Sequence, residues 1–369
     1  MARNLPLIVD EGSVAHRGLR LARLGAVVAI ALTLPYVVQT FQLSQITSVL
    51  ILATAIVGLN LLSGFGGQIS LGHAAFFGLG AYTAGVLSTK YGWALPLTFV
   101  AGMLLCFVVG VLVGVPALRL QGMYLALVTL AIGVIFPNVV RRFESFTGGS
   151  TGLIGVAYPP PAIPYFAGKA GATVWLYWLS VVALGLSCLV VWNIMRSRVG
   201  RGIVALRDNE SAAIVMGVNR ALVRTVLFGV SAAIAGLAGG LFAVNSGVLV
   251  PDSFSLLLTI ELLVAMILGG SASFWGPLFG AAIIYYVPVW TADIGGGPIA
   301  GVMFGTVVIV MVFVLPSGIA GGLKQLAKRF VRIAPRPPLT ATRQELPTAN
   351  AGLGAADQSL AEAVPAKRI

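Results

Sequence analysis

Charged residues are scarce in this chain, and their scarcity indicates the class of protein. Asp, Glu, Lys and Arg make up only 9% of the 369 residues, whereas hydrophobic residues make up 58%. A soluble domain carries about 25% charged residues, so this composition excludes an ordinary water-soluble domain. Apolar runs of about 20 residues, the length that crosses a bilayer as a helix, recur along the sequence. We therefore expect an all-α, polytopic integral membrane protein.

Histidine and cysteine are also rare, which argues against several kinds of chemistry. Cys106 and Cys188 both lie in apolar runs, where cysteine behaves as a small hydrophobic residue, so no disulfide framework is implied. His73 has no second histidine or cysteine pair near it in the sequence. We therefore expect neither a metal site nor the nucleophile–base pair of a membrane-embedded enzyme. No glycine-rich loop ends in Gly-Lys-Ser or Gly-Lys-Thr, so no nucleotide or other cofactor is expected on this chain.

Ten apolar segments have the length of a membrane-spanning helix. They lie near residues 24–41, 46–63, 70–88, 94–116, 122–140, 175–195, 225–245, 254–271, 274–290 and 298–315. The regions 46–88 and 254–290 are also compatible with short or re-entrant helices, so we expect about eight to ten spans. Ten spans divide into five and five, and an odd number in each half makes the halves antiparallel, as in the inverted repeats of many transporters.

Lysine and arginine are distributed unevenly between the two sides that these spans define. With the N-terminus inside, the inner segments contain 19 of them and the outer segments contain four. Loops rich in lysine and arginine stay cytoplasmic, so both termini are predicted to be cytoplasmic. The net charge of +12 then reflects topology, and nucleic acid is not an expected partner.

This topology divides the chain into segments. Residues 1–23 form a cytoplasmic N-terminal segment, and residues 24–323 form the membrane domain. Within that domain, residues 141–174 are an extracytoplasmic loop that is rich in Gly and Pro and predicted to be too irregular for a helix. Residues 196–224 are a strongly charged cytoplasmic loop. Residues 324–369 are rich in Pro, Ala and Thr and are predicted to be a disordered cytoplasmic tail.

Glycine is concentrated in one apolar stretch, residues 58–85, with the sequence GLNLLSGFGGQISLGHAAFFGLGAYTAG. Each glycine inside a helix costs about 1 kcal/mol relative to alanine, so this composition predicts a broken or closely packed pair of helices. Such backbone is tolerated at membrane depth only where protein or a water-filled cavity satisfies its polar groups. The residues of this break are therefore candidates for a translocation path: Gly64, Gly66, Gly67, Gln68, Ser70 and His73.

Simpler roles stay open for the same residues. The glycines suit close helix packing, Gln68 and Ser70 suit capping of the helix that begins near Ser70, and His73 suits a hydrogen bond within the packing.

The second half of the chain contributes three further candidates for the path. Gly269 and Gly270 form a weaker counterpart of the glycine-rich break. Glu261 is the only acidic residue inside a predicted span, and intramembrane acids usually have a partner or a role. For Glu261 that role is gating or contact with the ammonium group of a substrate, and the alternative is a structural carboxylate.

The loop 196–224 carries an amphipathic segment. Over residues 204–216 apolar side chains lie beside charged ones, and Gly217 follows at a position that ends a helix. A short amphipathic helix lies on lipid or docks into a groove of another protein, whereas a solvated loop would use its arginines only to set topology. The candidate docking residues are Arg207, Asp208, Glu210, Ala212, Ala213 and Gly217.

Several blocks of the chain resemble one family. The segment GRGIVALRDNESAAIVMGVN (residues 200–219) is similar to the cytoplasmic coupling loop of branched-chain amino acid (LivM-type) permeases of ABC importers. Ala212, Ala213 and Gly217 match the Glu-Ala-Ala spacing of the wider class, but Ser211 replaces the glutamate and Glu210 lies one residue earlier. The glycine-rich stretch resembles the signature near the start of these permeases. Further blocks follow in family order: PALRLQGMYLALVTLA, TGGSTGLIGV, ELLVAMILGGSASFWGPLFGA and LPSGIAGGL.

The resemblance covers most of residues 46–323 and implies one of two permease subunits that together form a path for branched-chain (hydrophobic) amino acids. It also implies a second, homologous permease subunit, two cytoplasmic ATPases that act through loops such as 200–219, and an extracytoplasmic solute-binding protein. The chain would then be a non-catalytic subunit in the lipid bilayer of the bacterial cell membrane.

Two other functions are compatible with the residues. The same scaffold could import urea, short amides or another small organic solute, because the binding protein largely selects the substrate in importers of this kind. An ion-coupled secondary transporter is the other alternative. Such proteins usually carry several ionisable groups within the membrane, and this chain has only one acidic residue, Glu261, inside a predicted span.

Overall fold

The computed structural model describes residues 7–10, 25, 29–117, 123–156, 168–295, 297–315, 317–323 and 331–334. Helices dominate this part of the chain, and a helix lies at each predicted span. The first covers residues 29–37. The others are α2 (Thr40–Leu59), α3 (His73–Tyr91), α4 (Leu95–Ala117), α5 (Met123–Arg142), α7 (Gly168–Arg196), α10 (Arg220–Ser246), α11 (Leu256–Gly269), α12 (Gly276–Gly295) and α13 (Gly297–Val314).

Among the described residues, five helices are long and apolar enough to cross a membrane: α2 with its continuation to Phe65, α4, α5, α7 and α10. Three shorter apolar helices lie within α11, α12 and α13. These helices confirm the polytopic, all-α membrane fold. The total of ten spans and the inverted five-and-five organisation stay predictions.

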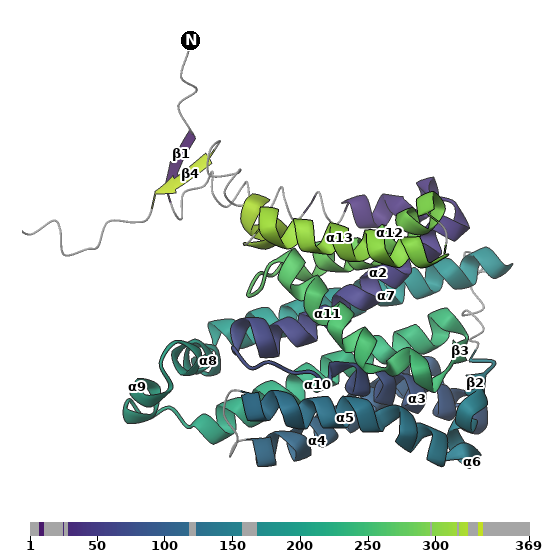
Figure 1. Ribbon diagram of the computed structural model, residues 1–369, viewed down its shortest axis with the longest axis horizontal. Coiled ribbons are helices and arrows are strands. Elements are labelled where there is room, and N and C mark those ends of the chain that lie inside the picture. Colours follow the sequence, from purple (N-terminus) through teal and green to yellow (C-terminus); the bar gives the residue numbers. More distant parts are fainter. Residues whose placement is uncertain are drawn as a thin grey trace, which may run out of the picture.

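The long helices lie side by side, and their connections gather at two opposite ends (Figure 1). One end carries α8 (Arg198–Asp208) and α9 (Glu210–Val215). The other end carries α6 (Glu144–Thr147) and an antiparallel pair of strands, β2 (Leu153–Ile154) and β3 (Val248–Leu249). The two loops predicted to face opposite sides of the membrane therefore lie at opposite ends of the bundle.

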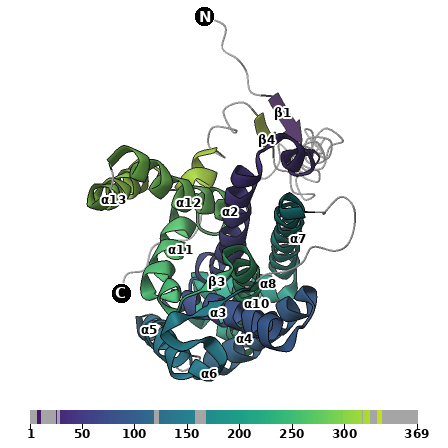
Figure 2. The same ribbon diagram turned by 90° about the vertical axis from the view of Figure 1, so that its right-hand side faces the viewer.

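The helices α2 and α10 form the centre of this bundle. In the most apolar stretch of 18 residues, 72% of α2 and 78% of α10 is buried. The corresponding share is at most 33% for α4, α5 and α7. α10 packs against α4, α3 and α2. Viewed along the bundle, α13 lies at one edge and α7 on the other side of α2 (Figure 2). The outer helices are left with apolar faces that suit lipid or another membrane subunit.

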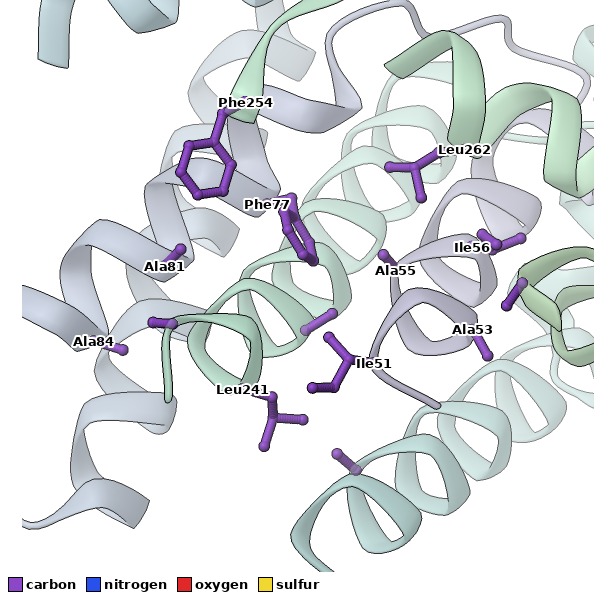
Figure 3. Close-up of a cluster of buried hydrophobic side chains, with 14 of the residues drawn as sticks. Ile51, Ala53, Ala55, Ile56, Phe77, Ala81, Ala84, Leu241, Phe254 and Leu262 are labelled. Atoms are coloured by element: carbon purple, nitrogen blue, oxygen red, sulfur yellow. The ribbon is translucent and has the colours of Figure 1, made fainter. Parts of the chain in front are cut away.

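Small residues bring the central helices close together. In the buried cluster of Figure 3, alanines of α2 and α3 lie among larger side chains from α10, α11 and the 3-10 turn Pro251–Phe254. A Cβ added to Gly80 of α3 would overlap the carbonyl oxygen of Gly236 in α10, and a Cβ added to Gly236 would lie 2.5 Å from the sulfur of Cys106 in α4. Because lipid tails are as apolar as the helices, such close packing is the main source of helix association.

The outer loop 141–174 is more structured than the sequence predicts. It contains α6, the 3-10 turn Gly149–Thr151 and strand β2, and α7 already begins at Gly168 within it. Gly148 and Gly152 have φ angles of +78°, which glycine adopts without a Cβ penalty, and these turns allow short elements to follow one another. The prediction of an irregular loop is therefore wrong for these parts, whereas residues 157–167 lie outside the described residues.

The predicted disordered tail also contains a regular element. Strand β4 (Val331–Ala334) pairs in parallel with β1 (Leu7–Asp10), so that Leu7 lies opposite Val331. β-branched residues favour extended backbone, and both segments carry them. The prediction of disorder from residue 324 onward does not hold for residues 331–334, and residues 324–330 and 335–369 lie outside the described residues.

The close packing at Gly80 predicts a difference between two glycine-to-alanine substitutions. Gly80→Ala should lower the thermal stability of the detergent-purified protein, because overpacking costs about 1–3 kcal/mol and the obstructing atoms belong to backbone. Gly185→Ala in α7 is the matched control, since a Cβ there meets no atom within 4 Å. Fluorescence-detected thermal unfolding should show a lower midpoint for the first variant and an unchanged or higher midpoint for the second. Equal midpoints would contradict the packing argument.

Candidate functional site

α2 ends in an unusual way at the glycine-rich break. After Leu59 the chain continues as a π-helix over Asn60–Phe65 and then runs without helical structure to α3. The amide of Gly66 donates to the carbonyl of Leu61 at 3.1 Å and closes the last turn. Gly67 then has a φ angle of +65°. The predicted break in a glycine-rich helix pair is confirmed.

The side chain of Asn60 ties this break to the turn between α11 and α12. Its Nδ2 donates to the carbonyl oxygen of Ser273 at 2.9 Å, and its Oδ1 accepts from the amide of Ala272 at 2.9 Å. Asn60 is only 2% exposed, so both bonds form away from water. A peptide group without a partner at membrane depth costs several kcal/mol. We call this pair of bonds the Asn60 bracket.

Two of the candidate path glycines lie against this arrangement. A Cβ added to Gly64 would overlap Asn60 Oδ1 and lie 2.7 Å from the amide nitrogen of Ala272. A Cβ added to Gly66 would overlap the side chain of Leu227 in α10. Close packing, the simpler of the two predicted roles, accounts for both glycines.

A small pocket lies beside the Asn60 bracket. Its volume is about 10 Å³, and it is lined by Val57, Asn60, Phe65, Cys188, Val191, Ser273, Phe274 and Pro277. The ring centroids of Phe65 and Phe274 are 5.4 Å apart. Pockets for small ligands usually enclose about 300–1,000 Å³, so this one is small for a ligand site in the conformation described.

The first turn of α3 is capped by other helices. The amide of Leu71 donates to Thr129 Oγ1 of α5 at 3.0 Å, and the amide of Ala74 donates to Thr259 Oγ1 of α11 at 3.2 Å. The N-cap residue is Gly72, which offers no side chain for capping. The Thr259 hydroxyl therefore satisfies an amide that a local cap would normally serve, and the Thr129 hydroxyl satisfies an amide in the unwound stretch before α3.

Capping by Gln68 or Ser70, one of the roles predicted for them, is therefore wrong. The carbonyl of Gln68 instead accepts from Ser63 Oγ at 2.8 Å. Ser70 and His73 are each 1% exposed. Within the described part of the chain, Ser70 Oγ and His73 Nε2 have no hydrogen-bond partner. The His73 ring bonds to the backbone of Ala55 in α2, which is a packing contact of the kind predicted for it.

The candidates of the second half lie on α11. A Cβ added to Gly269 would overlap the carbonyl of Gly276 in α12, and Gly270 has a φ angle of +112° at the start of the following turn. Glu261 is half-buried and forms no ion pair with any residue that the structure describes. The Asn60 bracket holds the turn after Gly270, so the two glycine-rich breaks lie in contact. Gly64 of the first break and Gly270 of the second are 206 residues apart in the sequence.

The predicted cytoplasmic loop folds into two short helices. α8 begins after Ser197 and α9 after Asn209, and each of these side chains accepts hydrogen bonds from the first turn of its helix. Asn209 is extended, with φ −154° and ψ 101°. The prediction of one helix over residues 204–216 is therefore wrong, because the asparagine cap interrupts it. Gly217, with a φ angle of +85°, follows α9 where the sequence predicts a helix end.

The acidic residues of this loop are both paired. Glu210 Oε1 lies 2.9 Å from Arg220 Nη1, and Glu210 Oε2 lies 2.8 Å from Arg224 Nη2. Asp208 Oδ1 lies 2.9 Å from its neighbour Arg207 in a more exposed position. Glu210 therefore joins α9 to α10, whereas Asp208 joins two consecutive residues of α8.

Apolar side chains project from the end of α9. Ile214, Val215 and Met216 are 46%, 86% and 84% exposed, and we call them the apolar tip. Ala212 is exposed beside them, while Ala213 is buried against the bundle. The tip lies at the end of the bundle farthest from β2 and β3 (Figure 1).

The two candidate regions touch each other. A Cβ added to Gly67 of the break would lie 2.7 Å from Cγ of Arg207 in α8. The aliphatic part of this arginine therefore covers the break, and long charged side chains commonly pack their methylene groups in this way.

Sequence reasoning missed the residues that join these regions. Asn60 was detectable as a lone amide in an apolar run next to glycines, because a buried amide needs partners. Its partners Ala272 and Ser273 offer no such signal, since backbone groups bond here. Arg220 and Arg224 entered the sequence analysis only as topology charges.

A sequence profile for the family described as "Branched-chain amino acid transport system / permease component" matches residues 41–315. This chain belongs to that family. It is therefore a transport permease with several membrane helices, and the resemblance that its motifs indicated is confirmed.

Individual transport permeases are similar to this chain over most of their length. The high-affinity branched-chain amino acid permease proteins LivM of Salmonella typhimurium and Escherichia coli are each 28% identical to this chain, and the alignments cover 85% of this chain and 77% of each relative. The autoinducer 2 import system permease protein LsrC of Salmonella typhi is 25% identical over 76% of this chain and 80% of its own length.

The Asn60 bracket predicts a marked loss of stability on Asn60→Leu. The substitution keeps the approximate size but leaves the Ala272 amide and the Ser273 carbonyl without their partner, at about 1–3 kcal/mol each. Asn138→Leu in α5 is the control, because Asn138 is exposed. The midpoint of thermal unfolding and the amount of protein expressed in membranes should fall for the first variant only. A wild-type midpoint for Asn60→Leu would show that the two hydrogen bonds of the bracket do not stabilise the protein.

Proposed function

We propose that this chain is a permease subunit of an ABC importer that carries branched-chain, hydrophobic amino acids into a bacterial cell. It pairs with a second, homologous permease subunit in the cell membrane, and both of its termini lie in the cytoplasm. Two cytoplasmic ATPase subunits drive the transport, and an extracytoplasmic solute-binding protein delivers the amino acid. The chain itself hydrolyses no ATP.

The observation that carries this proposal is the apolar tip of α9. Three apolar side chains project at the end of the bundle that the distribution of lysine and arginine predicts to be cytoplasmic. An apolar patch outside the membrane on a short, anchored helix suits a groove in a partner protein. We therefore assign ATPase docking to the loop 196–224, through the apolar tip and the exposed coupling residues Arg207, Asp208, Ala212 and Gly217. Glu210 and Ala213, the other two predicted coupling residues, face the bundle.

We place the translocation path beside the break between α2 and α3. Its candidate residues are Gly64, Gly66, Gly67, Gln68, Ser70 and His73, joined by Glu261 and Gly269 of α11 and by Gly270, which follows α11. Support comes from the contact of the two breaks at the Asn60 bracket, because unwound backbone that protein satisfies is typical of transport paths. In the conformation described, neighbouring atoms of Asn60, Ala272 and Leu227 pack closely against Gly64 and Gly66.

The family and two relatives named for branched-chain amino acids support that class of solute. The relative named for autoinducer 2 import shows that a similar chain serves a different solute. Urea, short amides and other small organic solutes are therefore the alternative within the same mechanism. Ligand profiles of the binding protein distinguish these solutes.

An ion-coupled secondary transporter is the alternative mechanism. Glu261 is the one acidic residue in the described helices α2, α3, α4, α5, α7, α10, α11 and α13 that lies away from their ends, and it has no ion-pair partner there. A single half-buried carboxylate is a poor basis for an ion relay. The ATP-driven mechanism is therefore favoured.

An uptake assay in proteoliposomes tests the mechanism. The chain, its partner permease and the two ATPases are reconstituted, with the binding protein outside and ATP inside. We expect leucine uptake that needs both ATP and the binding protein and persists with a protonophore. Uptake that collapses with the protonophore while ATP is intact would favour ion coupling instead.

The apolar tip predicts a docking defect in the double variant Val215→Asp, Met216→Asp. Two carboxylates in an apolar groove should weaken retention of the ATPase at least about tenfold, which corresponds to about 1.4 kcal/mol. The native side chains are exposed, so membrane insertion should be unchanged. Ser211→Asp, also exposed on α9, is the control. Co-purification of the ATPase with the tagged permease measures the effect. If the double variant retains as much ATPase as wild type, the tip is not part of the docking surface.

A further inference from the structure

Glu210 faces the helix bundle although it belongs to the loop that we assign to ATPase docking. It is the first residue of α9, and its two carboxylate oxygens contact two arginines one turn apart at the start of α10. The side chains of Glu210, Arg220 and Arg224 are 27%, 22% and 16% exposed. The carboxylate therefore links two helices at a place that solvent reaches only in part.

The neighbours of Glu210 point elsewhere. Consecutive residues of an α-helix are about 100° apart around its axis. Ser211 and Ala212 are accordingly exposed, while Ala213, three residues from Glu210 and on the same face, is 4% exposed. In this chain the acidic residue thus lies on the inward face of α9, and the outward face presents small and apolar side chains.

The other acidic residue of the loop lacks these properties. The ion pair between Asp208 and Arg207 joins adjacent residues, with side chains that are 60% and 35% exposed. Exposed pairs of this kind contribute little to stability, and this one connects no second helix. The carboxylate of Asp208 therefore links no two helices, unlike that of Glu210.

The helix to which Glu210 is tied reaches the break. Leu227 of α10 packs directly over Gly66, and Ser231 Oγ donates to the carbonyl of Gly58 in α2 at 2.7 Å. α10 is also the most buried of the long helices. A displacement of the start of α10 is thus passed to the end of α2 through packed contacts.

We propose that Glu210 is a positioning residue for transport: its ion pairs to Arg220 and Arg224 lock α9 onto α10, so that movement of the apolar tip moves α10 and the break. Glu210 does not dock the ATPase itself. The docking contact is made by the apolar tip, and the carboxylate transmits the movement. This inference rests on the proposed function of the loop 196–224.

The first test compares two charge-neutralising variants in the assembled, reconstituted transporter. Glu210→Gln should lower the amount of solute imported per ATP hydrolysed at least fivefold, while the ATPase co-purifies at the wild-type level. Glu144→Gln, which neutralises an exposed carboxylate of α6 at the opposite end of the bundle, should stay within twofold of wild type in both measurements. The double variant Glu210→Gln, Arg224→Gln should be no worse than Glu210→Gln, because both changes remove the same link. Unchanged import per ATP in Glu210→Gln, or loss of the ATPase from the complex, would overturn the proposal.

A second test measures the link without transport. Spin labels are placed at Ser211 of α9 and at Leu112 of α4, both exposed, in full-length protein in nanodiscs with Cys106 and Cys188 replaced by alanine. Pulsed electron paramagnetic resonance should give a narrow distribution of the distance between the two labels for the wild-type loop and for Asp208→Asn. The distribution should be broader for Glu210→Gln. An unbroadened distribution for Glu210→Gln would overturn the link even if transport falls. Absence of ATP-driven uptake by the wild-type complex would instead reject the proposed function. The distance distributions would still show whether Glu210 links α9 to α10.

Discussion

A polypeptide that leaves its helix inside a membrane must find hydrogen-bond partners within the protein, because lipid offers none. In this permease the break between α2 and α3 imposes that demand, and distant helices meet it. Asn60 bonds the turn after α11, Thr129 of α5 bonds the amide of Leu71, and Thr259 of α11 bonds the first turn of α3. The positions of α5 and α11 against the central helices therefore depend on one interruption in the chain.

The same interruption connects the membrane domain with the loop at its end. Arg207 of α8 covers Gly67, and Leu227 of α10 covers Gly66. Because α9 is tied to α10 through Glu210, the apolar tip, α10 and the break form one packed series. Close-packed interiors transmit strain, so a push at the tip has a physical route to the break. Loose loops without such contacts would provide no route.

Much of this architecture was predictable because bilayers impose simple rules on sequence. Apolar length located each helix to within several residues, although α7 begins seven residues before the predicted position at residue 175. Glycine content located the break, and the motifs around it indicated the family. Errors arose where a single side chain decides local geometry. Asn209 divides one predicted helix into two, and Gly72 replaces Ser70 at the start of α3.

The sequence by itself determined the membrane class, the helix positions, the glycine-rich break and the transport family. Each of these follows from local composition or from the order of motifs. Only the tertiary structure decided that Asn60 holds the turn at Ala272 and that Glu210 faces α10. The reason is physical: a buried polar group bonds to whichever partner folding brings within reach. For Asn60 that partner is backbone from the second half of the chain, and backbone groups are the same whatever the sequence.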